Sequence, residues 1–150
     1  MSKGRVTGIY VSPTEGELPE PVGSVRAYAG KGLEGNRYFY EDGNAPPGRA
    51  ITLISDDAVD EFVQESGVPL TSQKSRRNVS TTGIDLNALV GKRFRVGPIE
   101  CRGIQLCEPC TTMQARTAPG AIKALAHRAG LNAEILVGGE VRPGDAVVLL

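Results

Sequence analysis

Two cysteines separated by two residues are the clearest candidates for chemistry in this sequence. Cys107 and Cys110 stand in the stretch GIQLCEPCTTM, residues 103–113. This spacing occurs in zinc sites, in thiol–disulfide switches and around single reactive thiols. Pro109 suits the first position of a helix, and a thiol in the first turn of a helix has a lowered pKa. Cys110 is therefore a candidate thiolate, while Cys107 is either a small buried packing residue or a second functional thiol.

Two of the alternatives are disfavoured by geometry and chain order. A structural zinc site needs four ligands, and the chain offers Cys101, Cys107, Cys110 and its single histidine, His127. Cys101 and Cys107 fall six residues apart on one expected strand, so about 20 Å separates them, too far for one metal ion. A thioredoxin-like motif follows an early βαβ unit, whereas this motif follows most of the expected strands. A switch in which Cys107 resolves an oxidised Cys110 stays open.

The composition indicates one globular domain, residues 1–150. With 19 glycines, 10 prolines and only 5% aromatic residues, the chain is typical of short strands joined by many turns. The 17 basic and 17 acidic residues give a formal net charge of zero, so charge gives no reason to expect a nucleic-acid partner. The sequence has no signal-peptide pattern, no apolar stretch long enough for a membrane span, and an odd number of cysteines. We expect a cytoplasmic protein without a membrane partner or a disulfide framework.

Alternating and β-branched segments predict about eight short strands and two or three helices. The expected strands are residues 5–11, 22–28, 50–55, 76–83, 92–97, 99–106, 133–139 and 145–150. Residues 55–67 predict a helix, with a capping serine, acidic residues in the first turn and a final glycine. Residues 84–91 predict a helical turn, and residues 119–130 a second helix. Because strands and helices do not alternate regularly, we expect a mostly β, barrel-like fold rather than a parallel sheet.

Two further segments carry residues suited to binding. Residues 29–48 form a long Gly- and Pro-rich segment that includes Arg37, and a loop of this length is usually functional or disordered. Its aromatic residues favour function, although its glycines match no phosphate-binding motif. Arg77 and Asn78 stand at the start of an expected strand, and a guanidinium group suits contact with phosphate or an oxo-anion. Taken alone, adjacent arginines are more often a solvated surface pair.

Three stretches together resemble the MOSC domain, named for the C-terminal part of molybdenum cofactor sulfurases and also found as free-standing bacterial proteins. They are GLEGNRYF…GRAITLIS, RRNVSTTGIDLNALVGKRFRVGPIECRGIQLCEPC and HRAGLNAEILVGGEVRPGDAVVL, within Arg26 to Leu150. The resemblance implies a predominantly β, barrel-like MOSC fold. It also implies that Cys110 is the functional cysteine, which carries sulfur or ligates molybdenum.

The resemblance assigns further residues to a site for the molybdenum cofactor (molybdopterin). Arg77 and Asn78 match the Arg-Asn pair of the family, and Arg37 matches a basic residue that follows a Gly-Asp pair. These residues are expected to line an anion-binding cleft for the pterin phosphate and the oxo groups of the metal. Asn36 stands where the family usually has Asp, which removes a negative charge from this loop. Pyridoxal phosphate is not expected, because its lysine belongs to an aminotransferase-like domain outside these 150 residues.

Three functional hypotheses follow. The first is a molybdenum-cofactor-binding or sulfur-carrier domain acting through Cys110, in metal–sulfur transfer or in the reduction of N-hydroxylated compounds. Its partners would be a cysteine desulfurase or sulfurase and an electron-transfer protein. The second is a thiol–disulfide redox switch using Cys107 and Cys110. The third is a catalytically silent binding module, because a fold alone does not determine a function.

Overall fold

The computed structural model describes residues 3–13, 18–67, 69–73, 75–107 and 130–150. Eleven strands, one α-helix and one 3₁₀ helix lie in these residues. The strands are β1 (Lys3–Val11), β2 (Glu20–Pro21), β3 (Val25–Tyr28), β4 (Gly32–Leu33), β5 (Ile51–Ser55), β6 (Val79–Thr82), β7 (Arg93–Val96), β8 (Ile99–Leu106), β9 (Leu131–Val137), β10 (Gly139–Val141) and β11 (Ala146–Leu149). The helices are α1 (Asp56–Ser66) and η1 (Leu86–Leu89).

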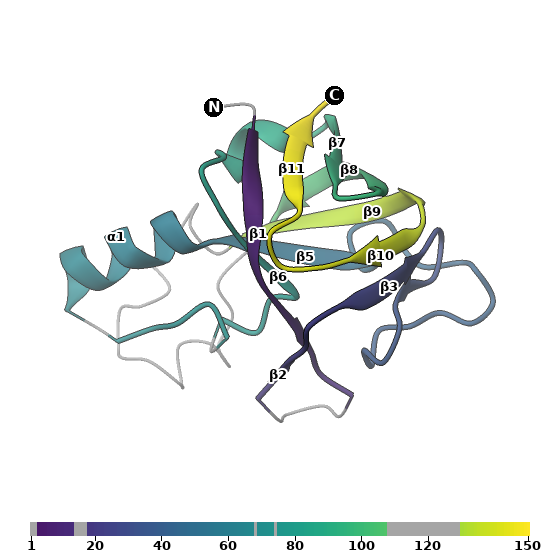
Figure 1. The fold of residues 1–150 in the computed structure, drawn as a ribbon, viewed down its shortest axis with the longest axis horizontal. Helices are drawn as coiled ribbons and strands as arrows, with labels where there is room; N and C mark the ends of the chain where they lie inside the picture. The colour runs from purple at the N-terminus through teal and green to yellow at the C-terminus, as the bar shows by residue number, and fades with distance from the viewer. Residues whose placement is uncertain (1–2, 14–17, 68, 74, 108–129) are drawn as a thin grey trace.

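Seven of these strands close into a barrel. Their order is β1, β11, β7, β8, β9, β5 and β6, with β6 pairing back to β1 (Figure 1). The β5–β6 pair is parallel and the other neighbours in this ring are antiparallel. The short strand β2 pairs with the end of β1, and β10, β3 and β4 form a separate three-stranded sheet. The prediction of a mostly β, barrel-like fold is confirmed.

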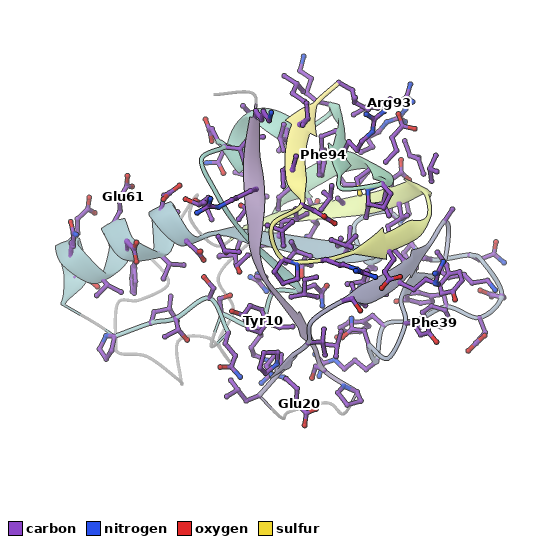
Figure 2. All side chains as sticks on the ribbon, in the orientation of Figure 1. Tyr10, Glu20, Phe39, Glu61, Arg93 and Phe94 are labelled. Atoms are coloured by element: carbon purple, nitrogen blue, oxygen red, sulfur yellow. The ribbon has the colours of Figure 1, made fainter. Side chains whose placement is uncertain are left out.

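Alternation along the strands fills the barrel with apolar side chains. Figure 2 shows the result for two adjacent residues of β7, since Phe94 lies within the barrel and Arg93 points away from it. Phe94 is fully buried, and Arg93 forms an exposed ion pair with Glu100 of β8. Cys101 of β8 is part of the same apolar interior. The inward positions stabilise the fold, because burying an apolar side chain contributes about 1.5–3 kcal/mol.

Helix α1 lies outside the barrel and extends away from it (Figure 1), and its ends match the sequence prediction. The Ser55 hydroxyl caps the first turn by accepting a hydrogen bond from the Ala58 N–H at 3.2 Å. Gly67 ends the helix in the left-handed conformation, with φ 69°, where a glycine is favoured. On the inner side of α1, Phe62 packs with Ile54 of β5 in a small second apolar cluster.

Two aspartates at the start of α1 fix it to the barrel. The Thr7 hydroxyl of β1 donates a hydrogen bond to Asp56 at 2.6 Å. Asp57 accepts hydrogen bonds from the Thr82 hydroxyl and from the Gly83 N–H, at 2.9 and 3.0 Å. The acidic first turn that predicted the helix therefore also anchors it to β1 and to the end of β6.

The differences from the sequence prediction are local. The three additional strands, β2, β4 and β10, have only two or three residues each, too few to show an alternating pattern. The expected strand over residues 76–83 begins at Val79, because Arg76 adopts a positive φ of 67° that is incompatible with an extended strand. Residues 84–91 contain η1 as predicted. The expected helix over residues 119–130 and the proposed helix start at Pro109 lie outside the residues that the structure describes, apart from Gly130.

Candidate functional site

Asn78 holds three strands together just before β6. Its Oδ1 accepts hydrogen bonds from the Thr52 N–H and the Thr52 hydroxyl, at 3.1 and 3.0 Å. Its Nδ2 donates to the carbonyl of Tyr10 in β1 at 3.3 Å. Asn78 is only 9% exposed, so these contacts satisfy a polar group that would otherwise be costly to bury. The side chain predicted to bind cofactor therefore also fixes the positions of β1, β5 and β6.

Cys107 lies beside this group, directly after β8. Its side chain is 3% exposed, and its thiol donates a hydrogen bond to Oδ1 of Asn132 at 3.0 Å. Asn132 of β9 is paired directly with Thr52 of β5. Thr52, Asn78, Cys107 and Asn132 therefore form a polar cluster on the outer face of the barrel wall. We call these four residues the outer polar cluster.

Arg77 also reaches this region. Gly130 has a φ of 110°, and a Cβ placed on it would lie 3.6 Å from Cγ of Arg77 and only 2.2 Å from the Leu53 carbonyl oxygen. A side chain at Gly130 would therefore clash with β5. Because glycine has no side chain, the backbone at residue 130 can lie close to β5. The Gly130 carbonyl accepts a hydrogen bond from the Cys107 N–H at 2.8 Å. Arg77 consequently lies close to the point where β8 leads into the segment that contains Cys110.

Asn36 and Arg37 are both bonded to Ser12. Ser12 directly follows β1 and stands two positions after Tyr10. The Asn36 side-chain oxygen accepts a hydrogen bond from the Ser12 N–H at 3.0 Å, and the Arg37 N–H donates to the Ser12 carbonyl at 2.9 Å. An aspartate at position 36 could accept the same hydrogen bond from the Ser12 N–H. The asparagine therefore removes a negative charge from the loop but keeps this bond. The loop of residues 29–48 is thus fixed to the strand that Asn78 also contacts.

The guanidinium of Arg37 contacts an aromatic ring that a second arginine shares. Its carbon lies 4.7 Å from the ring centroid of Tyr38, and Nη2 donates to the Tyr38 hydroxyl at 3.3 Å. The guanidinium of Arg49 lies 5.7 Å from the same centroid. Nη1 of Arg37 is enclosed and has no hydrogen-bond partner among the described residues. We call Arg37, Tyr38 and Arg49 the arginine–tyrosine cluster.

This cluster has the character of an anion site. None of the ion pairs between described residues includes Arg37 or Arg49, so no described carboxylate is paired with either guanidinium group. A buried donor without a partner is unfavourable unless a ligand, ion or water satisfies it. Gly48, next to Arg49, packs against the outer polar cluster, since a Cβ on it would lie 3.4 Å from Cβ of Asn132. The loop therefore connects the two clusters.

The three cysteines have different positions relative to this region. Cys101 faces the barrel interior, where burial, and to a lesser extent the charge of Glu100, raise the pKa of its thiol to about 12. Cys107 belongs to the outer polar cluster. Cys110 lies outside the described residues, as does His127. The facing of Cys101 and Cys107, one inward and one outward, gives them no common ligand position.

Comparison with protein-family models gives a match to the MOSC domain over residues 41–148. The chain belongs to the MOSC domain family. No curated protein matches the chain, and in the described residues no helix is long and apolar enough to cross a membrane.

Solved structures agree with the fold of this MOSC domain. The YuaD protein from Bacillus subtilis superimposes with a TM-score of 0.82 at 18% sequence identity, over 97% of this chain and 94% of that chain. YiiM from Geobacillus stearothermophilus gives a TM-score of 0.72 at 18% identity, over 98% of this chain and 75% of that one. YiiM from Escherichia coli gives a TM-score of 0.73 at 18% identity, over 100% of this chain and 70% of that one. At this identity, the likeness shows a common fold.

The sequence prediction did not single out Arg49, Thr52 or Asn132. Thr52 and Asn132 each stand between two core residues of a strand. A polar residue at such an outward position is ordinary, so only the pairing of β5 with β9 shows that the two meet. Arg49 stands two residues before β5, but its approach to Tyr38 depends on how the loop of residues 29–48 folds back.

Proposed function

We propose that this MOSC domain binds the molybdenum cofactor, with Cys110 as the reactive thiolate and with Arg37 and Arg77 as the groups that hold the anionic parts of the cofactor. The observation that carries the proposal is the enclosed Nη1 of Arg37, a donor without a partner among the described residues. The phosphate and oxo groups of the cofactor are acceptors of the kind that an unsatisfied guanidinium binds well. The donor set described here therefore fits the cofactor.

The position of Arg77 supports a common site with Cys110. Arg77 packs at Gly130, whose carbonyl binds the Cys107 N–H. Cys110 follows Cys107 by three residues, and three residues of extended chain span at most about 11 Å. The chain connection thus limits how far the thiol of Cys110 can lie from the Arg77 side of the barrel. A thiolate is a soft ligand, which suits a transition metal or a transferred sulfur atom.

In this proposal Asn78 acts mainly by positioning Arg77. Its side-chain oxygen is occupied by Thr52, and one of its amide hydrogens by Tyr10. These bonds fix the backbone from which the Arg77 side chain leaves the sheet. When bound, the cofactor would supply the redox or sulfur-transfer chemistry at its metal, and the protein would supply binding, orientation and the thiolate. A sulfur-donating enzyme and an electron donor would be its partners.

The decisive experiment is expression in a host that makes the cofactor, followed by molybdenum, pterin and persulfide analysis of the purified protein. We expect the wild type to carry cofactor or a persulfide on Cys110. Cys110→Ser should lose the persulfide or the metal, and Arg37→Gln should lower the pterin content severalfold. Arg95→Gln removes an exposed arginine of β7, a strand that pairs with none of β1, β5 and β6, and is the matched control. Wild-type protein with neither cofactor nor persulfide would overturn the proposal.

The thiol–disulfide switch makes a different prediction about Cys107. Its thiol is 3% exposed and donates a hydrogen bond to Asn132, and a disulfide with Cys110 would remove the proton that makes this bond. A count of free thiols before and after mild oxidation separates the hypotheses. Loss of two thiols that depends on both Cys107 and Cys110 would favour the switch, and no pairing would exclude it.

A further inference from the structure

A hollow lies between the end of β1 and the three-stranded sheet. Its volume is about 320 Å³, at the small end of the range for ligand pockets. Val11, Val22 and Val25 supply its apolar lining, and Arg26, Glu34 and Glu140 supply its charged groups. None of these residues belongs to the proposed cofactor site, so this inference does not depend on that proposal.

The two carboxylates that line the hollow differ in their partners, since only Glu140 forms ion pairs with described residues. Glu140 accepts a hydrogen bond from Arg142 at 3.1 Å and lies 3.7 Å from Arg26. The hydrogen bond and charge of Arg142, with smaller contributions from Ser24 and Arg26, keep the pKa of Glu140 below its ordinary value. Arg26 is thus the weaker of the two cationic partners of Glu140.

Glu34 is the lining carboxylate that has no cationic partner among the described residues. The printed contact of its side chain is the neutral hydroxyl of Tyr28, at 3.4 Å. Its backbone is fixed, because the Glu34 N–H donates to the Arg26 carbonyl at 2.9 Å. The exposed carboxylate of Glu34 thus lies beside an apolar surface and forms no ion pair with a described residue.

We propose that this hollow binds a small organic amine, with the ammonium group on Glu34 and the apolar body against Val11, Val22 and Val25. A cationic group complements the unpaired carboxylate, and an apolar body of a few carbon atoms fits the volume. An anionic ligand is disfavoured, because the one guanidinium of the lining is occupied by Glu140. The hollow is connected to the arginine–tyrosine cluster by the short segment from Glu34 to Arg37.

The test uses benzylammonium as the probe, with benzyl alcohol as its neutral analogue and benzoate as an anion of similar shape. Titrations followed by amide chemical shifts should show millimolar binding of benzylammonium, with shifts at Val11, Val22 and Val25. Because Glu34 is exposed to solvent, the charge contributes modestly, and we expect benzyl alcohol to bind about three- to fivefold more weakly. Benzoate should bind more weakly still.

Three variants make the result specific. Glu34→Gln should reduce benzylammonium binding to the level of benzyl alcohol, whereas Glu41→Gln, an exposed carboxylate outside the lining, should leave it unchanged. Ser24→Phe places a ring in the hollow and should abolish binding of every probe. Cys110→Ser should not affect amine binding, which separates this inference from the proposed function. Equal binding of the three probes, or unchanged binding in Glu34→Gln, would overturn it.

Discussion

The interior and the outer wall of the barrel use cysteine in opposite ways. Cys101 on β8 is surrounded by apolar side chains such as Phe94, with which it is paired across β7 and β8. Cys107, at the end of the same strand, contacts Asn132 within the outer polar cluster. A thiol packed among apolar side chains and one whose neighbours are hydrogen-bonding groups therefore stand only six positions apart.

This difference shows that the molecule gains stability in two ways. The interior depends on tight apolar packing, and its one thiol is held in the neutral form. The outer wall depends on directed hydrogen bonds that fix Asn78, and through it the backbone of Arg77. Variants in the two regions should therefore lower the free energy of unfolding by different amounts and for different reasons.

The largest expected effect is in the interior. Phe94→Ala should lower the free energy of unfolding by about 3–5 kcal/mol, because it leaves a cavity in a fully buried position. Urea unfolding measures this change. Phe39→Ala is the matched control, since Phe39 is half-buried and makes an edge-on contact with Tyr28 at 5.7 Å between centroids. The control should lose only about 1 kcal/mol, and equal losses would contradict the distinction.

A smaller effect is expected in the outer polar cluster. Asn78→Ala should lower the free energy of unfolding by about 1–3 kcal/mol, because it leaves the Thr52 donors and the Tyr10 carbonyl without their partner. Asn44→Ala, at an exposed position, should change stability by less than about 0.5 kcal/mol. Urea unfolding of both variants tests this, and a neutral Asn78→Ala would show that the cluster does not hold the strands together.

A pH dependence that belongs to Cys101 is expected only at alkaline pH and has no effect near neutrality. Its thiol has a pKa of about 12 in the folded protein, against an ordinary value of 9.0. The unfolded chain therefore releases this proton first, so the contribution to stability is complete below pH 9 and is lost as the pH rises toward 12. Within that window the slope is about 1.4 kcal/mol per pH unit for one group.

Other groups also titrate at alkaline pH, so the measurement is a difference. Urea unfolding of the wild type and of Cys101→Ala between pH 9 and pH 11 should show a steeper decline for the wild type. Parallel curves would mean that the interior of the barrel does not hold the Cys101 thiol neutral.

Much of the fold was accessible from the sequence because it depends on local patterns. Helix α1 was predicted from its serine cap, its acidic first turn and its final glycine, and all three act as expected. The larger strands were recognised from alternation. The strands β2, β4 and β10 were missed because so few residues show no period, and the start of β6 was misplaced because the positive φ of Arg76 is not encoded by a glycine.

For the candidate site too, some features could be predicted from the sequence and others could not. The sequence alone identified Arg37, Arg77 and Asn78 as candidate site residues. It also supplied the spacing of Cys107 and Cys110 and the resemblance to the MOSC family. Only the tertiary structure shows that Asn132 bonds Cys107 and that Thr52 bonds Asn78. It alone also shows that the Arg49 guanidinium lies near the ring of Tyr38. These contacts join residues from 11 to 26 positions apart. No local pattern specifies such a meeting, because it depends on which strands pair, in which register, and on how a long loop returns to the barrel.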